Sequence, residues 1–523
     1  MEIVENSVLK FVCPSSVAYT IENYIDKSEV LRDMGEVAEV AVYWGLDEMQ
    51  RLSRVAPASI KIPSPIERDY NWPGMYKPFD HQRDTARFLT LHKRAFCFNE
   101  AGTGKTSAAI WAADYLMRQG RVKRCLVICP LSIMYSAWQG DLFKSAMHRS
   151  CGVAHGSASK REKIINGMYE FVIINFDGVG VVEEAIKKAD FDLIIVDEAN
   201  AYKNPTTNRW KVLNRIVQAT DPRLWMLTGT PAAQSPVDAF GLAKLVNPNC
   251  PKYFTHFRDS VMFKVTQFKW APRPNAEQTV HKVLQPAIRF EKKDCLDLPE
   301  VTHSEREAPL TKQQMAYYRM LKSEMLFEAG GEEVSAVNAA TKLNKLLQIS
   351  GGAVYSDDGA VIEFDVSNRL NVVLEVIEEA SNKVLVFVPF THTIELLRAK
   401  LEKEGISCDV INGKVPVHRR GEIVTEFQTK KDPHVLLIQP QAASHGLTLT
   451  AADTIIWYAP VTSVETYLQA NARINRPGQK NAMSIIHIRG SDVEAKLYHM
   501  LQSNITNHEK IIDLYRQIIA SGT

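Results

Sequence analysis

A glycine-rich loop at residues 100–106 joins an apolar segment, residues 95–99, to an alanine-rich stretch that favours a helix. Strand, glycine loop and helix in this order are the setting of a phosphate-binding loop. Gly102 and Gly104 would let successive backbone N–H groups approach phosphate oxygens, and the helix that follows would add the positive end of its dipole. The sequence therefore predicts a site for a nucleoside triphosphate.

Two side chains at the end of this loop could act on the phosphates. Lys105 would neutralise the β- and γ-phosphates, and Thr106 would bind Mg²⁺ through its hydroxyl oxygen. The strict pattern GxxxxGK[ST] has glycine where this chain has Asn99, so a chance glycine-lysine turn is the alternative. The loop residues predicted to bind the nucleotide are Gly102, Thr103, Gly104, Lys105 and Thr106.

An acidic pair, Asp197 and Glu198, comes at the end of an apolar segment that predicts a strand at residues 193–197. Acidic side chains at the carboxyl end of a parallel strand lie beside the crevice in which ligands bind. Asp197 would hold Mg²⁺, and Glu198 would orient or deprotonate the attacking water. An acidic loop after a core strand is the alternative, and the presence of the glycine loop favours the catalytic interpretation.

Two further segments complete the candidate site. Residues 227–231, Leu-Thr-Gly-Thr-Pro, follow another apolar strand and place Thr228 and Thr230 near the same sheet edge, unless they form only a structural turn. Arg473 and Arg476 are three residues apart, which predicts that they share one helical face. Arginine supplied to a γ-phosphate from a second domain is an arginine finger, and a solvated basic helix is the alternative.

Two groups of apolar segments must position these residues. Near-continuous apolar runs rich in β-branched residues are typical of strands buried on both faces of a parallel sheet. The predicted strands are 95–99, 125–129, 171–176, 193–197 and 224–229 in the first group, and 384–388, 408–412, 435–439, 454–459 and 484–488 in the second. We therefore expect an α/β protein with two separate parallel sheets.

The regions outside these sheets differ in character. An Asp-Gly turn within residues 355–364 predicts a hairpin, and residues 340–347 have a helical pattern. Spaced apolar residues after Asp492 predict one or two closing helices. Residues 253–273 interleave aromatic and basic side chains, which favours either a packed core face or stacking on an exposed base.

Composition excludes several classes of protein. The chain has 523 residues, is 45% hydrophobic and 23% charged, and has no apolar run near the length of a membrane span. Its eight cysteines form no CxxC pair, so we expect buried thiols and a reducing cytoplasm. Residues 1–70 hold seven Lys and Arg against twelve Asp and Glu, whereas the whole chain has a net charge of +2. The remaining body is therefore mildly basic, which permits nucleic-acid binding.

The ordered motifs resemble helicase superfamily two, and within it the Swi/Snf family of double-stranded DNA translocases. The similar segments are KPFDHQ, NEAGTGKT, VICPLSIMYSAW, VIINFDGV, DEANAYKN, LTGTP, KVLVFVPF, SHGLTLTAAD and QANARINRPGQ. Lys203-Asn204 after the acidic pair and Gly478-Gln479 at the end of the last motif favour Swi/Snf proteins over DEAD-box RNA helicases. The compact spacing resembles phage- or bacterial-type and annealing-helicase-like members.

The resemblance implies two tandem RecA-like parallel-sheet domains with ATP between them, together with helical insertions and a small N-terminal accessory domain. The expected domains are 1–72 (N-terminal accessory domain), 73–300 (RecA-like lobe 1, with an aromatic and basic insertion at about 250–275), 301–365 (helical inter-lobe region with the hairpin), 366–490 (RecA-like lobe 2) and 491–523 (C-terminal helices).

The resemblance also implies roles for single residues. Gln82 matches the family's adenine-reading glutamine, and Gly446 and Gln469 lie in motifs that complete the ATP site. Asn200 stands where relatives usually have histidine or aspartate, so coupling of hydrolysis to the DNA side differs there. The coupling residues are Asn200, Thr228, Gly229 and Thr230, and the residues that match DNA-contacting loops are Pro130, Ser132, Asn175, Ser444 and Thr448.

The implied function is ATP-hydrolysing, Mg²⁺-dependent translocation on double-stranded or forked DNA, largely independent of sequence. Such an enzyme would remodel DNA structures or protein–DNA complexes in DNA repair or replication. The alternatives are a strand-separating DNA or RNA helicase with a single-strand preference, and an ATP-binding scaffold without turnover. We expect a monomer in the cytoplasm of a bacterium or phage-infected host, without membrane contact, whose residues 1–72 could bind a protein partner.

Overall fold

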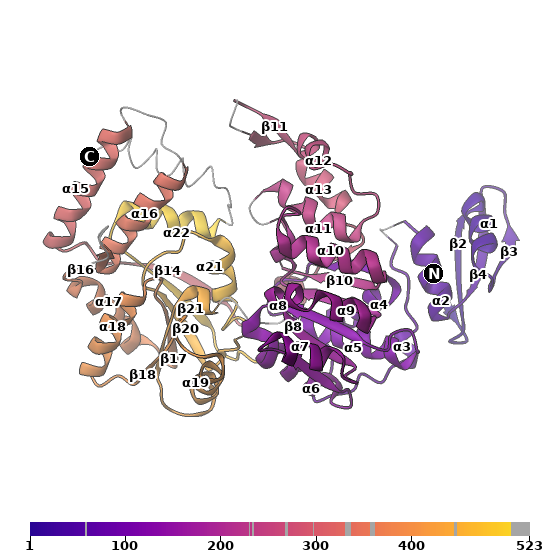
Figure 1. The fold of residues 1–523 in the computed structure, drawn as a ribbon, viewed down its shortest axis with the longest axis horizontal. Helices are drawn as coiled ribbons and strands as arrows, with labels where there is room; N and C mark the ends of the chain where they lie inside the picture. The colour runs from indigo at the N-terminus through magenta and orange to yellow at the C-terminus, as the bar shows by residue number, and fades with distance from the viewer. Residues whose placement is uncertain are drawn as a thin grey trace. The chain divides into compact units, whose positions relative to one another are not determined.

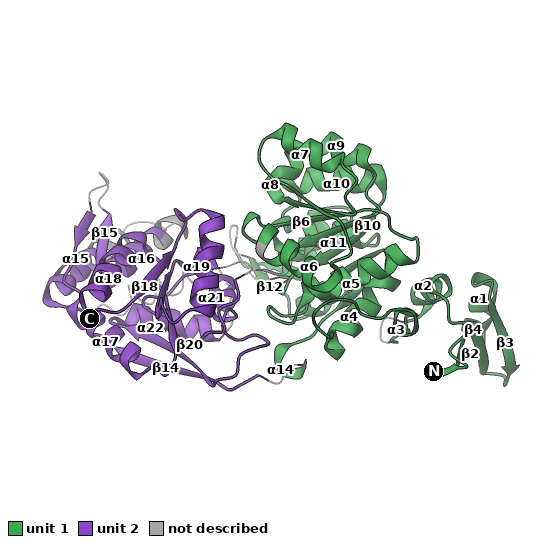
Figure 2. Cartoon of the chain, turned by 90° about the horizontal axis from the view of Figure 1, so that it is seen from below, with its two compact units in different colours: residues 1–232, 236–295 green, residues 233–235, 296–523 purple. Residues whose placement is uncertain are grey.

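The structure is a computed structural model with two compact units (Figure 2). Unit 1 contains residues 1–232 and 236–295, and unit 2 contains residues 233–235 and 296–523. Each unit contains one parallel sheet, as predicted (Figure 1). The residues that the structure describes are 1–57, 60–229, 231–232, 235–266, 270–295, 298–329, 336–355, 361–443 and 447–503. None of the helices in these ranges has the length and apolarity to cross a membrane.

The chain begins with a four-stranded antiparallel sheet and a helix that packs on it. The strands in sheet order are β1 (Glu2–Val4), β2 (Val8–Pro14), β4 (Val37–Tyr43) and β3 (Ser28–Asp33), and the helices are α1 (Ser15–Tyr24), α2 (Leu46–Val55) and α3 (Ile66–Asp69). Side chains alternate along β4, which buries Val40 and Val42 in one apolar cluster with Ile21 of α1. This cluster continues through Met49 and Ile66 into the core of unit 1.

The sheet of unit 1 is parallel throughout. Its strands in sheet order are β13 (Ala287–Ile288), β5 (Arg94–Cys97), β10 (Arg223–Leu227), β9 (Leu193–Asp197), β6 (Cys125–Cys129), β8 (Phe171–Asn175) and β7 (Cys151–Ala154). Alternate residues of β6 enter opposite cores, with Cys125, Val127 and Cys129 on one face and Leu126 and Ile128 on the other. Burial on both faces is therefore confirmed, and both cysteines are free thiols.

Helices cover this sheet, and one short hairpin extends from the helical region. The helices are α4 (Asp80–Leu91), α5 (Lys105–Arg118), η1 (Leu131–Ile133), η2 (Met134–Gln139), α6 (Gly140–Ala146), α7 (Ala158–Ile165), α8 (Phe176–Val181), α9 (Glu183–Ala189), η3 (Ala199–Tyr202), α10 (Asn208–Thr220), η4 (Pro236–Asp238), α11 (Ala239–Val246), α12 (Phe254–Val261), α13 (Ala276–Val283) and α14 (Lys292–Cys295). The hairpin pairs β11 (Met262–Lys264) with β12 (Trp270–Pro272) in antiparallel register.

The sheet of unit 2 is also parallel throughout. Its strands in sheet order are β14 (Val301–Glu307), β21 (Met483–Arg489), β20 (Ala452–Trp457), β17 (Lys383–Phe387), β19 (Val435–Ile438) and β18 (Cys408–Ile411). The five strands predicted for the second group are all present. β14 differs from expectation, because the predicted helical region 301–365 begins with this mostly exposed edge strand.

The remaining elements of unit 2 are helices and a second hairpin. The helices are α15 (Lys312–Ala329), α16 (Ala336–Gly351), α17 (Ser367–Glu379), α18 (Thr391–Lys403), α19 (Val417–Thr429), α20 (Pro440–Ala443), α21 (Val464–Asn471) and α22 (Asp492–Gln502). β15 (Ala353–Tyr355) and β16 (Val361–Glu363) form the predicted hairpin, whose turn lies outside the described residues. α22 is the first of the predicted closing helices, and residues 504–523, for which a second was predicted, lie outside the described residues.

Candidate functional site

The predicted phosphate-binding loop connects β5 to α5. Gly102 and Gly104 have φ angles of 89° and 77°, in the left-handed region that residues with a side chain rarely adopt. A Cβ atom at Gly104 would lie 2.0 Å from Nε2 of Gln82. Position 104 therefore requires glycine for its backbone conformation, and a side chain there would also have to displace the end of the Gln82 side chain. α5 begins at Lys105, so the N-terminus of a 14-residue helix adjoins the loop.

The Lys105 side chain lies along its own loop. Its ammonium group donates hydrogen bonds to the carbonyl oxygens of Asn99 and Glu100, at 2.8 and 3.2 Å. Thr103 is buried, and its hydroxyl group also donates to the Glu100 carbonyl, at 2.8 Å. Thr106 is in the first turn of α5. The loop residues predicted from the sequence are therefore brought together at the C-terminal edge of β5.

Asn99, which departs from the strict loop pattern, has a structural role. Its side chain is buried, its Nδ2 atom donates to the Thr85 hydroxyl group at 2.8 Å, and its Oδ1 atom accepts from the N–H of Phe290 at 3.0 Å. The side chain thus joins α4 to the segment that follows β13. Glycine could not make either bond, which explains asparagine at this position.

Gln82 links α4 to the same loop. Its Oε1 atom accepts from the N–H of Phe79 at 2.9 Å, and its Nε2 atom donates to the Thr103 carbonyl at 3.3 Å. His81 Nε2 also lies 2.8 Å from this carbonyl oxygen. The residue predicted to read adenine is therefore directly beside the phosphate-binding loop.

Asp197 is the last residue of β9, and both of its carboxylate oxygens accept hydrogen bonds. Trp138 Nε1 donates to Oδ2 at 2.9 Å, and the N–H of Glu198 donates to Oδ1 at 2.9 Å. Burial raises the pKa of the Asp197 carboxyl group, although the nearby positive charge of Lys105 opposes this shift. Sequence reasoning missed Trp138, because it approaches Asp197 from η2, an element far away along the chain.

The residues after Asp197 form a strained turn that packs on α11. Glu198 has a φ angle of 52°, in a region that costs residues with a side chain free energy and is often found at functional sites. Asn200 follows in η3. A Cβ atom at Gly241 of α11 would lie 2.2 Å from the carbonyl oxygen of Lys203, and Lys203 Nζ lies 3.3 Å from Asp238. The segment of the acidic pair is therefore tightly connected to α11.

Residues 228 and 229 lie against the phosphate-binding loop. The N–H of Thr228, which is fully buried, donates to the Cys97 carbonyl at 3.0 Å. A Cβ atom at Gly229 would lie 3.4 Å from the backbone nitrogen of Ala101. The prediction that this segment shares the sheet edge with the glycine loop is thus confirmed for these two residues, whereas Thr230 lies outside the described residues.

The side chains at this edge fit a nucleoside triphosphate with Mg²⁺. Mg²⁺ prefers oxygen ligands and is commonly held by one or two carboxylates together with substrate phosphates. Asp197 would supply a carboxylate, which two hydrogen bonds orient, Thr106 would supply a hydroxyl group, and Lys105 would supply a positive charge for the phosphates. Across the described ranges, no group of three or more His, Cys, Asp or Glu side chains could hold a metal by itself.

The two arginines in unit 2 do not lie on a helix, so that prediction is wrong. α21 ends at Asn471, and Arg473 and Arg476 lie in the turns that follow. Pro477 accounts for Arg476, because the residue before a proline is disfavoured in the helical conformation, and α21 has ended five residues earlier. Arg473 is buried: its Nε atom donates to the Gln469 carbonyl at 2.7 Å, and its Nη1 atom donates to the Leu447 carbonyl at 3.2 Å.

Arg476 is more accessible than Arg473. It is half-buried, and its Nη1 atom donates to the hydroxyl group of the exposed Thr448 at 3.2 Å. Gln479, which is buried, donates to the Ala452 carbonyl at 2.8 Å. The last two predicted motifs are therefore joined within unit 2. Two predicted site residues there, Ser444 and Gly446, lie outside the described residues.

The predicted DNA-contacting residues of unit 1 differ in exposure. Pro130 is buried, and Ser132 is half-buried in η1. Asn175 is buried, and its Oδ1 atom accepts a hydrogen bond from Arg161 Nη1 at 2.8 Å. The Asn175 side chain therefore serves packing around α7 and α8 and is turned away from solvent.

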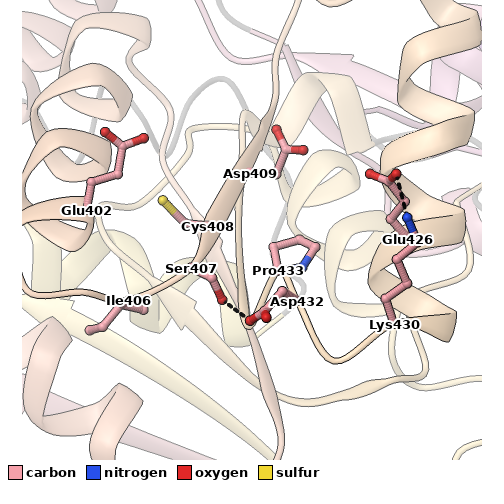
Figure 3. Close-up of a pocket in the computed structure, with 9 residues that line it drawn as sticks. All are labelled: Glu402, Ile406, Ser407, Cys408, Asp409, Glu426, Lys430, Asp432 and Pro433. Atoms are coloured by element: carbon pink, nitrogen blue, oxygen red, sulfur yellow. Dashed lines mark hydrogen bonds and ion pairs between the residues drawn. The ribbon is translucent and has the colours of Figure 1, made fainter.

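A pocket of about 400 Å³ lies at the β18 edge of the unit 2 sheet (Figure 3). Its lining residues are Glu402, Ile406, Ser407, Cys408, Asp409, Glu426, Lys430, Asp432 and Pro433. The Glu426 carboxylate is 3.0 Å from Lys430 Nζ, and burial raises the pKa of the Cys408 thiol. None of the predicted site residues lines this pocket, which is therefore separate from the candidate site.

Two family models match the chain. A model described as the SNF2-related domain matches residues 81–350, and a model described as the helicase conserved C-terminal domain matches residues 368–478. The first includes the glycine loop, the acidic pair and residues 228–229, and the second includes both arginines.

Relatives with similar sequences include bacterial, animal and phage proteins. The chain is 25% identical to an uncharacterized ATP-dependent helicase of Mycoplasma genitalium, over 75% of this chain and 37% of the relative. It is 25% identical to the mouse chromodomain-helicase-DNA-binding protein 1-like, over 79% of this chain and 47% of the relative. The chain thus spans less than half the length of these two relatives. Putative protein p41 of Acyrthosiphon pisum secondary endosymbiont phage 1 is 26% identical, over 80% of this chain and 94% of the relative.

Among solved structures, the Sulfolobus solfataricus SWI2/SNF2 ATPase core in complex with dsDNA is similar to this chain at 22% identity and a TM-score of 0.41. The match covers 83% of this chain and 92% of the Sulfolobus chain.

Proposed function

The chain belongs to the SNF2-related family, and on that premise we propose that it is an ATP-hydrolysing translocase that acts on double-stranded DNA. One observation carries the proposal: the glycine loop, the oriented Asp197 carboxylate and residues 228–229 meet at one edge of the unit 1 sheet.

The residues of unit 1 would bind and orient the nucleotide. Lys105 would exchange its two carbonyl contacts for phosphate oxygens, and backbone N–H groups of the glycine loop would hold the same phosphates. Mg²⁺, held by Asp197 and Thr106, would neutralise charge on the β- and γ-phosphates. Glu198 would orient or deprotonate the attacking water from the strained turn after β9.

We assign different roles to the two arginines of unit 2. Arg473 would position the loop at Leu447, because both its Nε and Nη1 atoms donate to backbone carbonyls of this unit. Arg476 would be the arginine finger, because it is half-buried and its Nη1 atom donates to an exposed hydroxyl group, that of Thr448, which a phosphate oxygen could replace while Nε keeps its bond to the Ala472 carbonyl at 2.8 Å. Gln469 would support the same motif from α21.

DNA would be held mainly through its phosphates, with low sequence specificity and strong salt dependence. Ser132 and Thr448 offer hydroxyl groups at loops for this purpose, and Pro130 and Asn175 would contribute through the backbone beside them. The eight free cysteines are in keeping with action in a reducing cytoplasm, and we take the monomer as the working unit.

ATP hydrolysis measured with linear duplex DNA, forked DNA, single-stranded DNA and RNA, at low and moderate salt, tests the proposal. Strong stimulation by duplex or forked DNA is expected. Stimulation by single strands or RNA alone would instead favour a strand-separating helicase. Absence of turnover under all conditions would favour an ATP-binding scaffold.

Glu198→Gln tests the catalytic assignment directly. The amide cannot accept the proton of the attacking water, so turnover should fall about 10²- to 10⁴-fold while ATP binding is kept. Glu162→Gln, at an exposed position of α7, is the matched control and should turn over ATP like the unaltered protein. Equal turnover of the two variants would rule out the proposed role of Glu198.

A further inference from the structure

Exposed apolar side chains gather on α12 and on the β11–β12 hairpin of unit 1. Their exposed fractions are 55% for Tyr253, 41% for Phe254, 42% for Phe263 and 50% for Val265. Phe257, on the same helix, is fully buried and stacks on Phe240 of α11 with ring centroids 5.5 Å apart. This region is therefore anchored in the core of unit 1 by Phe257 and by an edge contact of Phe254 with Phe240, and it presents Tyr253 and Phe263 to solvent. Figure 1 shows the hairpin beyond the ends of α12 and α13.

The two faces of the hairpin differ. The register places Lys264 opposite Trp270, and Phe263 opposite Ala271. Side chains of directly paired residues lie on the same face, and neighbours along a strand lie on opposite faces. Trp270 packs under the guanidinium group of Arg258, 4.0 Å from the ring centroid, so its face is turned toward α12. Phe263 is therefore on the other face, away from the helix.

Positive charges surround the exposed rings. Lys252, Lys264 and Arg273 are exposed, and the structure gives none of them an acidic partner among the residues it describes. Asp259, the one acidic residue in the sequence 252–273, already pairs with Arg258 at 3.0 Å. A purely apolar partner surface would gain nothing from these cations, whereas nucleic acid satisfies both features, because phosphates attract the cations and every base can stack on an aromatic ring.

We propose that this aromatic–basic hairpin binds unpaired DNA at a fork or junction, with Phe263 stacked on an exposed base at one face, and with Lys264, on the opposite face, and Arg273 at phosphates of the strand where it passes the edge of the hairpin. The proposal builds on the proposed translocase function and adds a preference that duplex translocation alone does not require. A blunt duplex has no unstacked base to offer to Phe263. The hairpin would therefore direct the enzyme to branched DNA.

Fluorescence anisotropy with a forked duplex and a blunt duplex of equal length, in the absence of ATP, tests this site. Phe263→Ala should weaken binding to the fork roughly 5- to 150-fold, the range expected for loss of one base–aromatic stack, and should change binding to the blunt duplex less than about twofold. Phe263→Trp should keep the fork preference. Phe143→Ala, on α6 of the same unit and 64% exposed, is the matched control and should leave the fork preference unchanged.

A fluorescent base analogue, 2-aminopurine, placed at the first unpaired position of the fork provides a direct readout. The unaltered protein should quench its emission by stacking, Phe263→Ala should lose the quenching, and Phe143→Ala should retain it. Lys264→Gln should lower the slope of log K against log salt by about 0.7 for the fork, as loss of one single-strand phosphate contact requires. A lower slope without loss of stacking in this variant would support separate roles for the ring and the cation.

Unchanged fork binding and unchanged quenching in Phe263→Ala would overturn the inference, and a hairpin that serves a protein partner would then be the better explanation. This outcome is distinguishable from failure of the proposed function. ATP hydrolysis is measured separately, so an enzyme stimulated by duplex DNA with no effect of the hairpin variants refutes only the hairpin site. A protein that binds forks through Phe263 but hydrolyses no ATP refutes only the translocase.

Discussion

Trp138→Phe removes the hydrogen bond from an indole nitrogen to the Asp197 carboxylate and leaves a ring in the same space. The bond joins Nε1 of Trp138 to Oδ2 of Asp197 at 2.9 Å, and both side chains are buried. Asp197 Oδ1 keeps its bond from the N–H of Glu198. The substitution should therefore allow the carboxylate to rotate while the strand that carries it stays in place.

The expected loss can be worked from this single bond. Hydrogen bonds to a charged group contribute about 1.5–3 kcal/mol, and each 1.36 kcal/mol in a barrier is tenfold in rate. Because one of the two carboxylate oxygens remains held, we expect the lower end of this range, about a tenfold fall in turnover. The Mg²⁺ concentration needed for half-maximal hydrolysis should rise as well, since Asp197 would be less well oriented.

Trp225→Phe is the matched control for this experiment. Trp225 is fully buried in β10, and its Nε1 atom donates to the His92 carbonyl at 3.1 Å, so the substitution also removes one indole hydrogen bond from the core of unit 1. Both variants should lose stability in urea denaturation, Trp138→Phe the more because its bond is to a charged carboxylate and that of Trp225 is to a neutral carbonyl. Only Trp138→Phe should lower turnover and alter the Mg²⁺ dependence, and equal effects of both variants on turnover would refute the reasoning.

Three further predictions concern the packing that supports the site. Burial raises the pKa of the Asp114 carboxyl group on α5, but hydrogen bonds from Tyr70 and Arg149 outweigh this effect and lower the pKa below its usual value. Asp114→Asn should therefore lower the free energy of unfolding, measured by urea denaturation at pH 7, by about 3 kcal/mol. Because the folded pKa is lowered, this difference should be complete above about pH 4 and shrink as the pH falls further. Arg369→Met leaves the fully buried Glu494 without its 2.7 Å ion pair and should lower the free energy of unfolding by about 3–5 kcal/mol. The double variant with Glu494→Leu should recover much of this loss. A double variant no more stable than the single one would contradict this explanation. Gly241→Ala would place a methyl group 2.2 Å from a backbone oxygen, so it should lower the free energy of unfolding by about 1–3 kcal/mol and reduce turnover. Gly421→Ala is the control: it has open space around it and should change neither quantity.

Strands buried on both faces could be predicted from the sequence, whereas three of the four edge strands of the two parallel sheets, β7, β13 and β14, could not. Residues 125–129 of β6 are apolar without interruption because both faces of this central strand are covered. β14, Val301–Glu307, lies at the edge of the unit 2 sheet, and six of its seven residues are exposed. An exposed strand needs no run of apolar residues, so its sequence does not differ from that of a polar loop.

At the candidate site, residues that lie in one local motif could be predicted from the sequence, whereas contacts between residues far apart along the chain could not. The glycine loop lies within seven consecutive residues, and the left-handed backbone conformations at positions 102 and 104 require glycine, which the sequence has at both. Trp138 precedes Asp197 by 59 residues, and Asn99 precedes its partner Phe290 by 191 residues. A hydrogen bond across such a separation depends on the arrangement of sheet strands, which no spacing within a motif contains.

The contacts around the glycine loop provide a physical route from the nucleotide to the neighbouring loop. The Lys105 ammonium group bonds to the carbonyl oxygens of residues 99 and 100, and Gly229 packs on the backbone of residues 99–101. Thr228 is tied to β5 through the Cys97 carbonyl at 3.0 Å. The space between Gly229 and residues 99–101 would hold about one methyl group, so a larger shift of residues 99–101 would bring this backbone against Gly229. Transfer of Lys105 from these carbonyls to phosphate oxygens would release that backbone, and the segment at Thr228 and Gly229 is therefore placed to respond to ATP.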